Sequence, residues 1–232
     1  MTPPGRKPAM PGIRACVFDA YGTLFDVHSA VARLRPRLGA QADALSQLWR
    51  TKQLEYTWLR ALMGRHTDFW QVTGDALDYA LARFQVEPGP IREPLMQAYL
   101  ALDAYPEVPE VLRRLREGGF KTAILSNGEP KMLAAGARSA GIDGLLDAIL
   151  SVEDVGIFKP DPRVYRLAVD RLGVAPGEIA FQSSNAWDVH GAACFGLRPV
   201  WINRQGAPLE RLPGGPERQL RDLSGLPALL GL

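Results

Sequence analysis

Short apolar runs alternate with amphipathic stretches along most of the chain. The apolar runs each end in a polar cluster, as KTAIL does before SNG, and predict buried strands. The amphipathic stretches predict helices that stop at glycine, as in VPEVLRRLREGG. Strands that alternate with helices in this way predict an α/β fold built on a doubly wound parallel sheet. The predicted strands are residues 13–18, 121–125, 148–152, 178–182 and 199–203.

Residues 28–105 interrupt this alternation. Two long helical patterns, ALSQLWRTKQLEYTWLRALM and DFWQVTGDALDYALARF, follow each other there with no convincing strand between them. This arrangement predicts a helical cap subdomain over residues 28–105, inserted after the first strand of a Rossmann-like core domain formed by residues 13–27 and 106–232. Residues 1–12 are rich in Pro and Gly and predict a flexible N-terminal tail.

The first of the two cap helices has two distinct faces. One face is an apolar stripe at helical spacing, which predicts burial in the core. The second face carries one cationic and two apolar side chains at intervals of four residues, so all three can point toward a site. The stripe is Leu45, Trp49, Tyr56, Leu59 and Met63, and the second face is Arg50, Leu54 and Trp58.

The composition narrows the classes of function. Apolar residues make up 47% and charged residues 22% of 232 residues, with a net charge of +2 and no dense Lys/Arg run. This balance favours small-molecule chemistry over binding of nucleic acid or a membrane surface. We find no secretion-type segment and no stretch long enough to cross a bilayer, and Cys16 and Cys194 fall where burial as reduced thiols is expected. A cytoplasmic location is therefore predicted.

Polar residues follow three of the predicted strands. Asp19 comes directly after the first, SNG after KTAIL, and SSNAWD after EIAFQ, while Lys159 stands in IFKPDP just before a helix. Open parallel sheets bind ligands beyond the carboxyl ends of their strands, so these groups are expected to converge on one edge. Singly, each is an ordinary turn or solvated residue. Their order along the chain makes them a candidate site.

In that order, from Ile13 onward, the residues resemble the haloacid dehalogenase superfamily. The stretches FDAYGTLFDV, LWRTKQLEYTWLRALM, SNG, FKPDPRVY and SSNAWD are most similar to its L-2-haloacid dehalogenase branch, the type II dehalogenases. Most of the superfamily are phosphatases that use an Asp-x-Asp element and Mg²⁺. Here Tyr21 stands in place of the second Asp, and Ser184 stands where a further acid is expected. The resemblance therefore implies a reaction without metal or other cofactor.

The implied reaction is hydrolytic dehalogenation of short (S)-2-haloalkanoic acids to (R)-2-hydroxyalkanoic acids. The carboxylate of Asp19 would attack C2 opposite the halogen and form an ester, which water then hydrolyses. A halide leaving group needs no general acid, which gives a reason for Tyr21. A second anion at that position would also repel the carboxylate of the substrate. The implied partners are a small 2-halocarboxylate and halide ion.

The resemblance also assigns roles to particular residues. Lys159 would keep Asp19 ionised, Asp188 would orient or deprotonate the hydrolytic water, and Arg50 would steer the substrate and stabilise the departing halide. The implied catalytic residues are Asp19, Thr23, Arg50, Lys159, Tyr165, Ser183, Asn185 and Asp188. The implied substrate-binding residues are Ala20, Tyr21, Arg50, Leu54, Phe69, Ser126, Asn127 and Trp187; no metal ligand is implied.

Alternatives stay open at this point. The chain could instead be a Mg²⁺-dependent phosphatase that keeps partial metal binding through Asp19 and Asp188, or an inactive relative that only binds small carboxylates or a partner protein. Arg50 taken alone fits a surface arginine, and Tyr165, Trp187 and Phe69 also fit core packing. By resemblance, a homodimer with the helical cap at its interface is expected.

Overall fold

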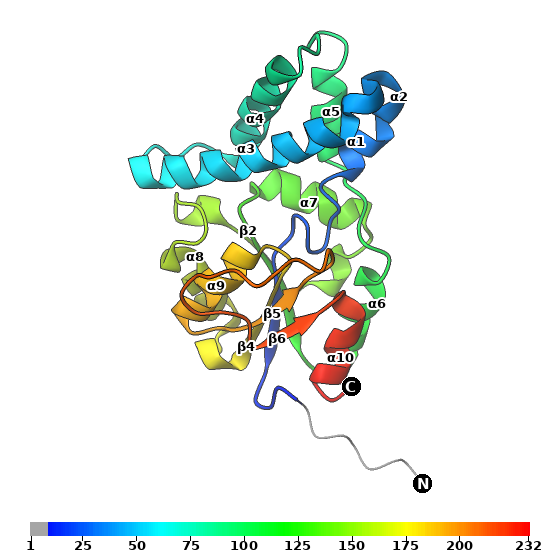
Figure 1. The fold of residues 1–232 in the computed structure, drawn as a ribbon. Helices are drawn as coiled ribbons and strands as arrows, with labels where there is room; N and C mark the ends of the chain where they lie inside the picture. Colours follow the sequence, from blue (N-terminus) through cyan, green and yellow to red (C-terminus); the bar gives the residue numbers. More distant parts are fainter. Residues whose placement is uncertain (1–8) are drawn as a thin grey trace.

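The structure is a computed structural model and describes residues 9–232. Within these residues the sheet has six strands in the order β3-β2-β1-β4-β5-β6, and every neighbouring pair is parallel (Figure 1). The five predicted strands are confirmed, whereas β6 was not predicted. The strands are β1 (Ala15–Phe18), β2 (Lys121–Ser126), β3 (Ala148–Ser151), β4 (Ile179–Ser183), β5 (Arg198–Ile202) and β6 (Arg218–Leu220).

Helices cover both faces of the sheet, as a doubly wound fold requires. α8 and α9 pack together on one face, and α6 and α10 pack together on the other (Figure 1). The local sequence explains these elements: for example, the Asp161 side chain caps α8 and Gly173 ends it in the left-handed conformation, with φ 64°. The helices are α6 (Val108–Glu117), α7 (Pro130–Ser139), α8 (Pro162–Leu172), α9 (Ala186–Phe195) and α10 (Leu226–Leu229).

The predicted insertion is helical and lies over the carboxyl ends of the strands (Figure 1). Its two connections to the core run side by side. The N–H of Asp26 donates to Asp103 O at 2.8 Å, and the N–H of Tyr105 donates to Leu24 O at 3.0 Å. We call this pair of connections the hinge ladder. The inserted helices are α1 (Ser29–Arg33), α2 (Arg35–Leu38), α3 (Ala42–Met63), α4 (Phe69–Arg83) and α5 (Arg92–Tyr99).

Helix α3 corrects one prediction. Leu45 and Trp49 of its apolar stripe are buried, but Leu59 is 50% and Met63 is 64% exposed. The helix is 22 residues long and packs along α4, which has only 15, so its C-terminal end projects past α4 (Figure 1). Periodicity alone could not show where the covering helix stops.

Two further expectations need correction. Residues 1–8 of the predicted tail lie outside the described residues, but Met10 is buried and its N–H donates to Leu229 O at 3.1 Å, so the predicted tail extends too far. Cys16 is buried as expected, whereas Cys194 is exposed. In residues 9–232, no helix combines the length and apolarity needed to cross a bilayer.

Candidate active site

Asp19 is the first residue beyond the central strand β1. Its N–H donates to Gln182 O of β4 at 2.9 Å, and its side chain is almost fully buried. A tight turn follows, in which the carbonyl of Ala20 accepts N–H groups of the next residues and Gly22 adopts φ 91°. The strand and the turn together fix the carboxylate at the edge of the sheet.

Both oxygens of Asp19 are hydrogen-bonded. Oδ2 accepts from Asn185 Nδ2 at 2.8 Å and from Thr23 Oγ1 at 3.2 Å, with Ser183 Oγ at 3.5 Å. Thr23 Oγ1 itself accepts from the N–H of Ser184 at 2.8 Å, which directs its hydroxyl hydrogen toward the carboxylate. Oδ1 accepts from Lys159 Nζ at 3.2 Å. The structure therefore brings these predicted residues together.

Lys159 lies between two buried carboxylates. Its Nζ also donates to Asp188 Oδ2 at 2.8 Å, while Tyr165 OH donates to Asp188 Oδ1 at 2.7 Å. Burial disfavours the charged ammonium, but Asp188 and Asp19 outweigh it and raise the pKa of Lys159. Burial raises the pKa of Asp188 to about 6, against the lowering by Lys159. The Tyr165 hydroxyl is therefore part of the site as well as of the core.

The SNG turn after β2 supports the site from the side. Asn127 Oδ1 accepts the backbone N–H of Lys159 at 3.0 Å, which fixes the segment that carries the lysine. Ser126 Oγ accepts the N–H of Gly128 at 3.1 Å. A Cβ at Gly128 would lie 2.8 Å from a ring carbon of Tyr21, so only glycine lets this ring approach. The turn thus positions both Lys159 and Tyr21.

Arg50 reaches the site from α3. Its Nη2 donates to Tyr21 O and to Asn185 Oδ1, both at 3.2 Å, and its Nη1 donates to Gln53 Oε1 at 2.8 Å. Within residues 9–232 Arg50 forms no ion pair, and its side chain is half-buried. Because three neutral oxygens hold the guanidinium, the interpretation of Arg50 as a surface arginine is wrong.

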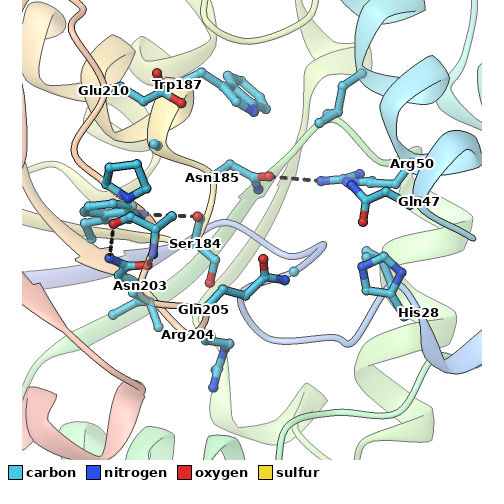
Figure 2. A pocket seen from close by; sticks show the side chains of 18 of the residues that line it. His28, Gln47, Arg50, Ser184, Asn185, Trp187, Asn203, Arg204, Gln205 and Glu210 are labelled. Atoms are coloured by element: carbon cyan, nitrogen blue, oxygen red, sulfur yellow. Dashed lines mark hydrogen bonds between the residues drawn. The ribbon is translucent and has the colours of Figure 1, made fainter. Parts of the chain in front are cut away.

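A cavity of about 420 Å³ lies between α3 and the core. Figure 2 shows Arg50 and Asn185 meeting at its wall, with His28 and Gln47 on the same side as Arg50. Of the predicted apolar wall, Leu54 and Trp187 line this cavity.

The other two residues of that wall, Tyr21 and Phe69, are buried and pack ring against ring at 5.4 Å between centroids. Neither ring lines this cavity, but Asp19 and Lys159 do not line it either. The role of Tyr21 and Phe69 in an apolar wall therefore stays a prediction.

Sequence reasoning missed Gln53 and Tyr99, which contact each other beside Arg50. Tyr99 OH donates to Gln53 Oε1 at 3.1 Å, and both side chains are buried. Gln53 could have been found, because it lies three residues after Arg50 on the same helical face. Tyr99 comes from α5, and no local pattern indicates that it returns to this site.

Arg204 is a further residue that the sequence did not reveal. It follows β5, and its Nη2 donates to Thr23 O at 2.9 Å. The same guanidinium lies 3.6 Å from the ring centroid of Tyr105 and pairs with Glu107 at 2.7 Å. Arg204 thus joins the turn after Asp19 to the end of the hinge ladder.

The residues do not fit a magnesium site. Asp19 and Asp188, the two carboxylates that a phosphatase would use, both bind the ammonium of Lys159. Tyr21 and Ser184 supply no further carboxylate, and within residues 9–232 no group of three or more His, Cys, Asp or Glu side chains could hold a metal ion. The carboxylates of the site are compensated by an ammonium.

With this fold and geometry, the chain belongs to the haloacid dehalogenase-like hydrolases, whose family model matches residues 13–196. Its curated relatives include dehalogenases of one kind. It is 51% identical over 219 residues to (S)-2-haloacid dehalogenase 4A of Burkholderia cepacia, with 94% of this chain and 95% of that one covered.

Two solved structures agree with this placement. A dehalogenase crystal structure superposes with a TM-score of 0.94 at 50% identity and covers 96% of this chain and 99% of that one. The L-2-haloacid dehalogenase from Xanthobacter autotrophicus with chloropropionic acid covalently bound gives a TM-score of 0.85 at 39% identity, with 94% and 98% covered.

Proposed function

We propose that this protein is an (S)-2-haloacid dehalogenase that converts short (S)-2-haloalkanoic acids to (R)-2-hydroxyalkanoic acids without metal. The observation that carries this proposal is the buried carboxylate of Asp19, held by Lys159 on one oxygen and lying near an arginine that pairs with no acid in residues 9–232. The (S)-2-haloacid dehalogenases among its relatives and the covalently bound chloropropionic acid in a related structure support it.

In the first step Asp19 is the nucleophile. A carboxylate oxygen attacks C2 opposite the halogen, a C–O bond forms, and the carbon–halogen bond breaks with its electron pair leaving on the halide. This inverts C2 and leaves an ester on Asp19. Lys159 offsets the repulsion between the attacking carboxylate and the substrate anion. Arg50, with the Asn185 amide and the Trp187 ring edge, stabilises the departing halide.

In the second step water hydrolyses this ester. The water oxygen attacks the side-chain carbonyl carbon of Asp19, Asp188 accepts a proton, and the acyl C–O bond breaks to release the 2-hydroxy acid. The proton returns to the hydroxyl of the product. Ser183 and Asn185 position the water, and Tyr165 and Lys159 hold Asp188, as their hydrogen bonds support.

The substrate carboxylate is bound at the turn after β1. The N–H groups of Ala20 and Tyr21 have no acceptor among residues 9–232, and the hydroxyl of Ser126 and the amide of Asn127 lie at the end of the neighbouring strand. Leu54 and Trp187 provide the apolar wall for the alkyl group.

The test uses purified protein in EDTA with chloroacetate and each enantiomer of 2-chloropropionate, followed by halide release. We expect halide from chloroacetate and the (S) enantiomer but not from the (R) enantiomer, and none from the Asp19→Asn variant. In a single turnover in H₂¹⁸O the label should enter the side chain of Asp19. If chloro and bromo substrates all release no halide, the proposal is wrong.

The same protein distinguishes the alternatives. A Mg²⁺-dependent phosphatase would release phosphate from a generic phosphoester, and EDTA would abolish that release. An inactive binding protein would release neither ion.

We also propose a homodimer with α3 at its interface, because Leu59, Leu62 and Met63 expose apolar side chains at the end of that helix. Light scattering after gel filtration would test it. The cytoplasmic location remains a prediction from the sequence.

A further inference from the structure

Gln53 is a buried amide whose orientation is fixed by its three partners. It is 1% exposed, and its Oε1 accepts from Arg50 Nη1 at 2.8 Å and from Tyr99 OH at 3.1 Å. Its Nε2 donates to Thr73 Oγ1 at 2.7 Å, and Thr73 Oγ1 donates its hydrogen to Phe69 O at 2.6 Å. Thr73 can therefore only accept from Gln53, so the amide cannot flip.

The tyrosine contact strengthens this orientation. Burial raises the pKa of Tyr99, so its hydroxyl keeps the proton that it donates to Gln53 Oε1. Helices α3, α4 and α5 thus each contribute a side chain to one network, through Gln53, Thr73 and Tyr99. The result is an oxygen atom aimed at Arg50.

The chemical nature of that oxygen matters for the guanidinium. An acidic residue at position 53 would hold Arg50 as well, but it would also neutralise it. The amide of Gln53 and the other acceptors, Tyr21 O and Asn185 Oδ1, are all neutral. A half-buried cation held by neutral dipoles keeps its full attraction for an anion that enters the cavity.

We propose that Gln53 is a positioning residue that orients Arg50 toward the leaving halide while leaving its charge uncompensated. This inference rests on the proposed dehalogenase function and deepens it, because it explains how the insertion presents a free cation to the reacting centre. Gln53 itself does not touch the substrate. It acts through Arg50.

The test compares Gln53→Glu with Gln53→Met. Gln53→Glu keeps the shape but pairs a carboxylate with Arg50, so we expect kcat/KM to fall about 10- to 100-fold and the inhibition constant for bromide to rise about tenfold. Gln53→Met leaves Arg50 charged but removes the hydrogen bond that orients it, so kcat/KM should fall while the inhibition constant for bromide changes less. The matched control is Gln41→Glu, an exposed position of the insertion with the same change of charge.

A pH series separates positioning from mere structural support. The deficit in bromide affinity of Gln53→Glu should shrink only at the acidic end of the pH range, because pairing with Arg50 lowers the pKa of the introduced carboxyl, whereas the deficit of Gln53→Met should stay constant relative to the native protein. Thermal unfolding of all variants shows whether activity merely follows stability. Native kcat/KM and native bromide inhibition in Gln53→Glu would overturn the proposal.

The outcome can be told apart from failure of the function itself. If the native protein releases no halide from any 2-haloacid, the dehalogenase proposal fails. Titration calorimetry with bromide on the native protein and the same variants still decides about Gln53. Equal bromide affinity in the native protein and Gln53→Glu would then reject the role proposed here.

Discussion

The two cations of the site are held in opposite ways. Lys159 belongs to the core, is 1% exposed, and is bound by the carboxylates of Asp19 and Asp188. Arg50 belongs to the insertion, is half-buried, and is bound among the described residues by neutral oxygens alone. The charge of Lys159 is paired with the two carboxylates at the reacting centre, whereas the charge of Arg50 remains available to an arriving anion.

Removing the core cation should have the largest effect. Lys159→Met leaves two buried carboxylates without a counter-ion, so we expect a loss of about 3–5 kcal/mol in the free energy of unfolding, together with loss of activity. Urea unfolding measures the first, and halide release measures the second. The destabilisation should be smaller at pH 5 than at pH 8, because protonation relieves the carboxylates. An unfolding free energy equal to that of the native protein would break the comparison.

Removing the cation of the insertion should separate activity from stability. Arg50→Met should lower kcat/KM about 10²- to 10³-fold, because the halide loses its stabilising charge. The free energy of unfolding should change by only about 1–2 kcal/mol, since only hydrogen bonds to neutral groups are lost. Steady-state halide release and urea unfolding on the same preparation provide both values. A stability loss as large as that of Lys159→Met would contradict the distinction.

The contact between the two regions can be tested at Gly128. In Gly128→Ala the added Cβ would meet the Tyr21 ring at 2.8 Å and Leu133 at 2.9 Å, which should cost about 1–3 kcal/mol of stability. Because Tyr21 stacks on Tyr99 of α5, activity should fall as well. Gly144→Ala is the control, since a Cβ there meets nothing within 4 Å. The unfolding temperature and the rate of halide release of this control should equal those of the native protein.

The smallest effect is expected within the core half. Asp188 must be ionised to accept a proton, and with a pKa of about 6 it should make kcat/KM fall as the pH drops below 6. The hydrogen bond from Tyr165 lowers this pKa, so Tyr165→Phe should move the acidic limb of the pH profile to higher pH. Tyr79→Phe, at an exposed tyrosine, should leave the limb in place. An unmoved limb in Tyr165→Phe would argue against Asp188 as the base.

The sequence anticipates the core half of the site better than the insertion half. Asp19 follows β1, Lys159 precedes α8, and Asp188 lies in the first turn of α9 after β4. The rule that the carboxyl ends of parallel strands meet at one edge brings them together. β6 was missed because Arg218–Leu220 has neither an apolar run nor an alternating pattern. The prediction succeeded for residues whose positions follow from the order of strands and helices along the chain.

The insertion half depends on how helices pack, which periodicity does not encode. Helical spacing indicated that Arg50 and Leu54 share a face, and both line the cavity. It could not indicate that Tyr99, from α5, would share an acceptor with Arg50, or that Leu59 would be uncovered. These features depend on where one helix ends relative to another, and that is a property of the assembled fold.

The hinge ladder has a consequence for how the enzyme can change over evolution. Both connections of the insertion leave the core beside the turn after Asp19, and they are tied to each other by backbone hydrogen bonds between Asp26 and Asp103 and between Leu24 and Tyr105. Backbone bonds do not depend on side-chain identity, so the joint tolerates sequence change on its far side. The insertion can therefore change its helices and the residues that line the cavity while Asp19, Lys159 and Asp188 keep their positions in the core. The two halves of the site can diverge at different rates.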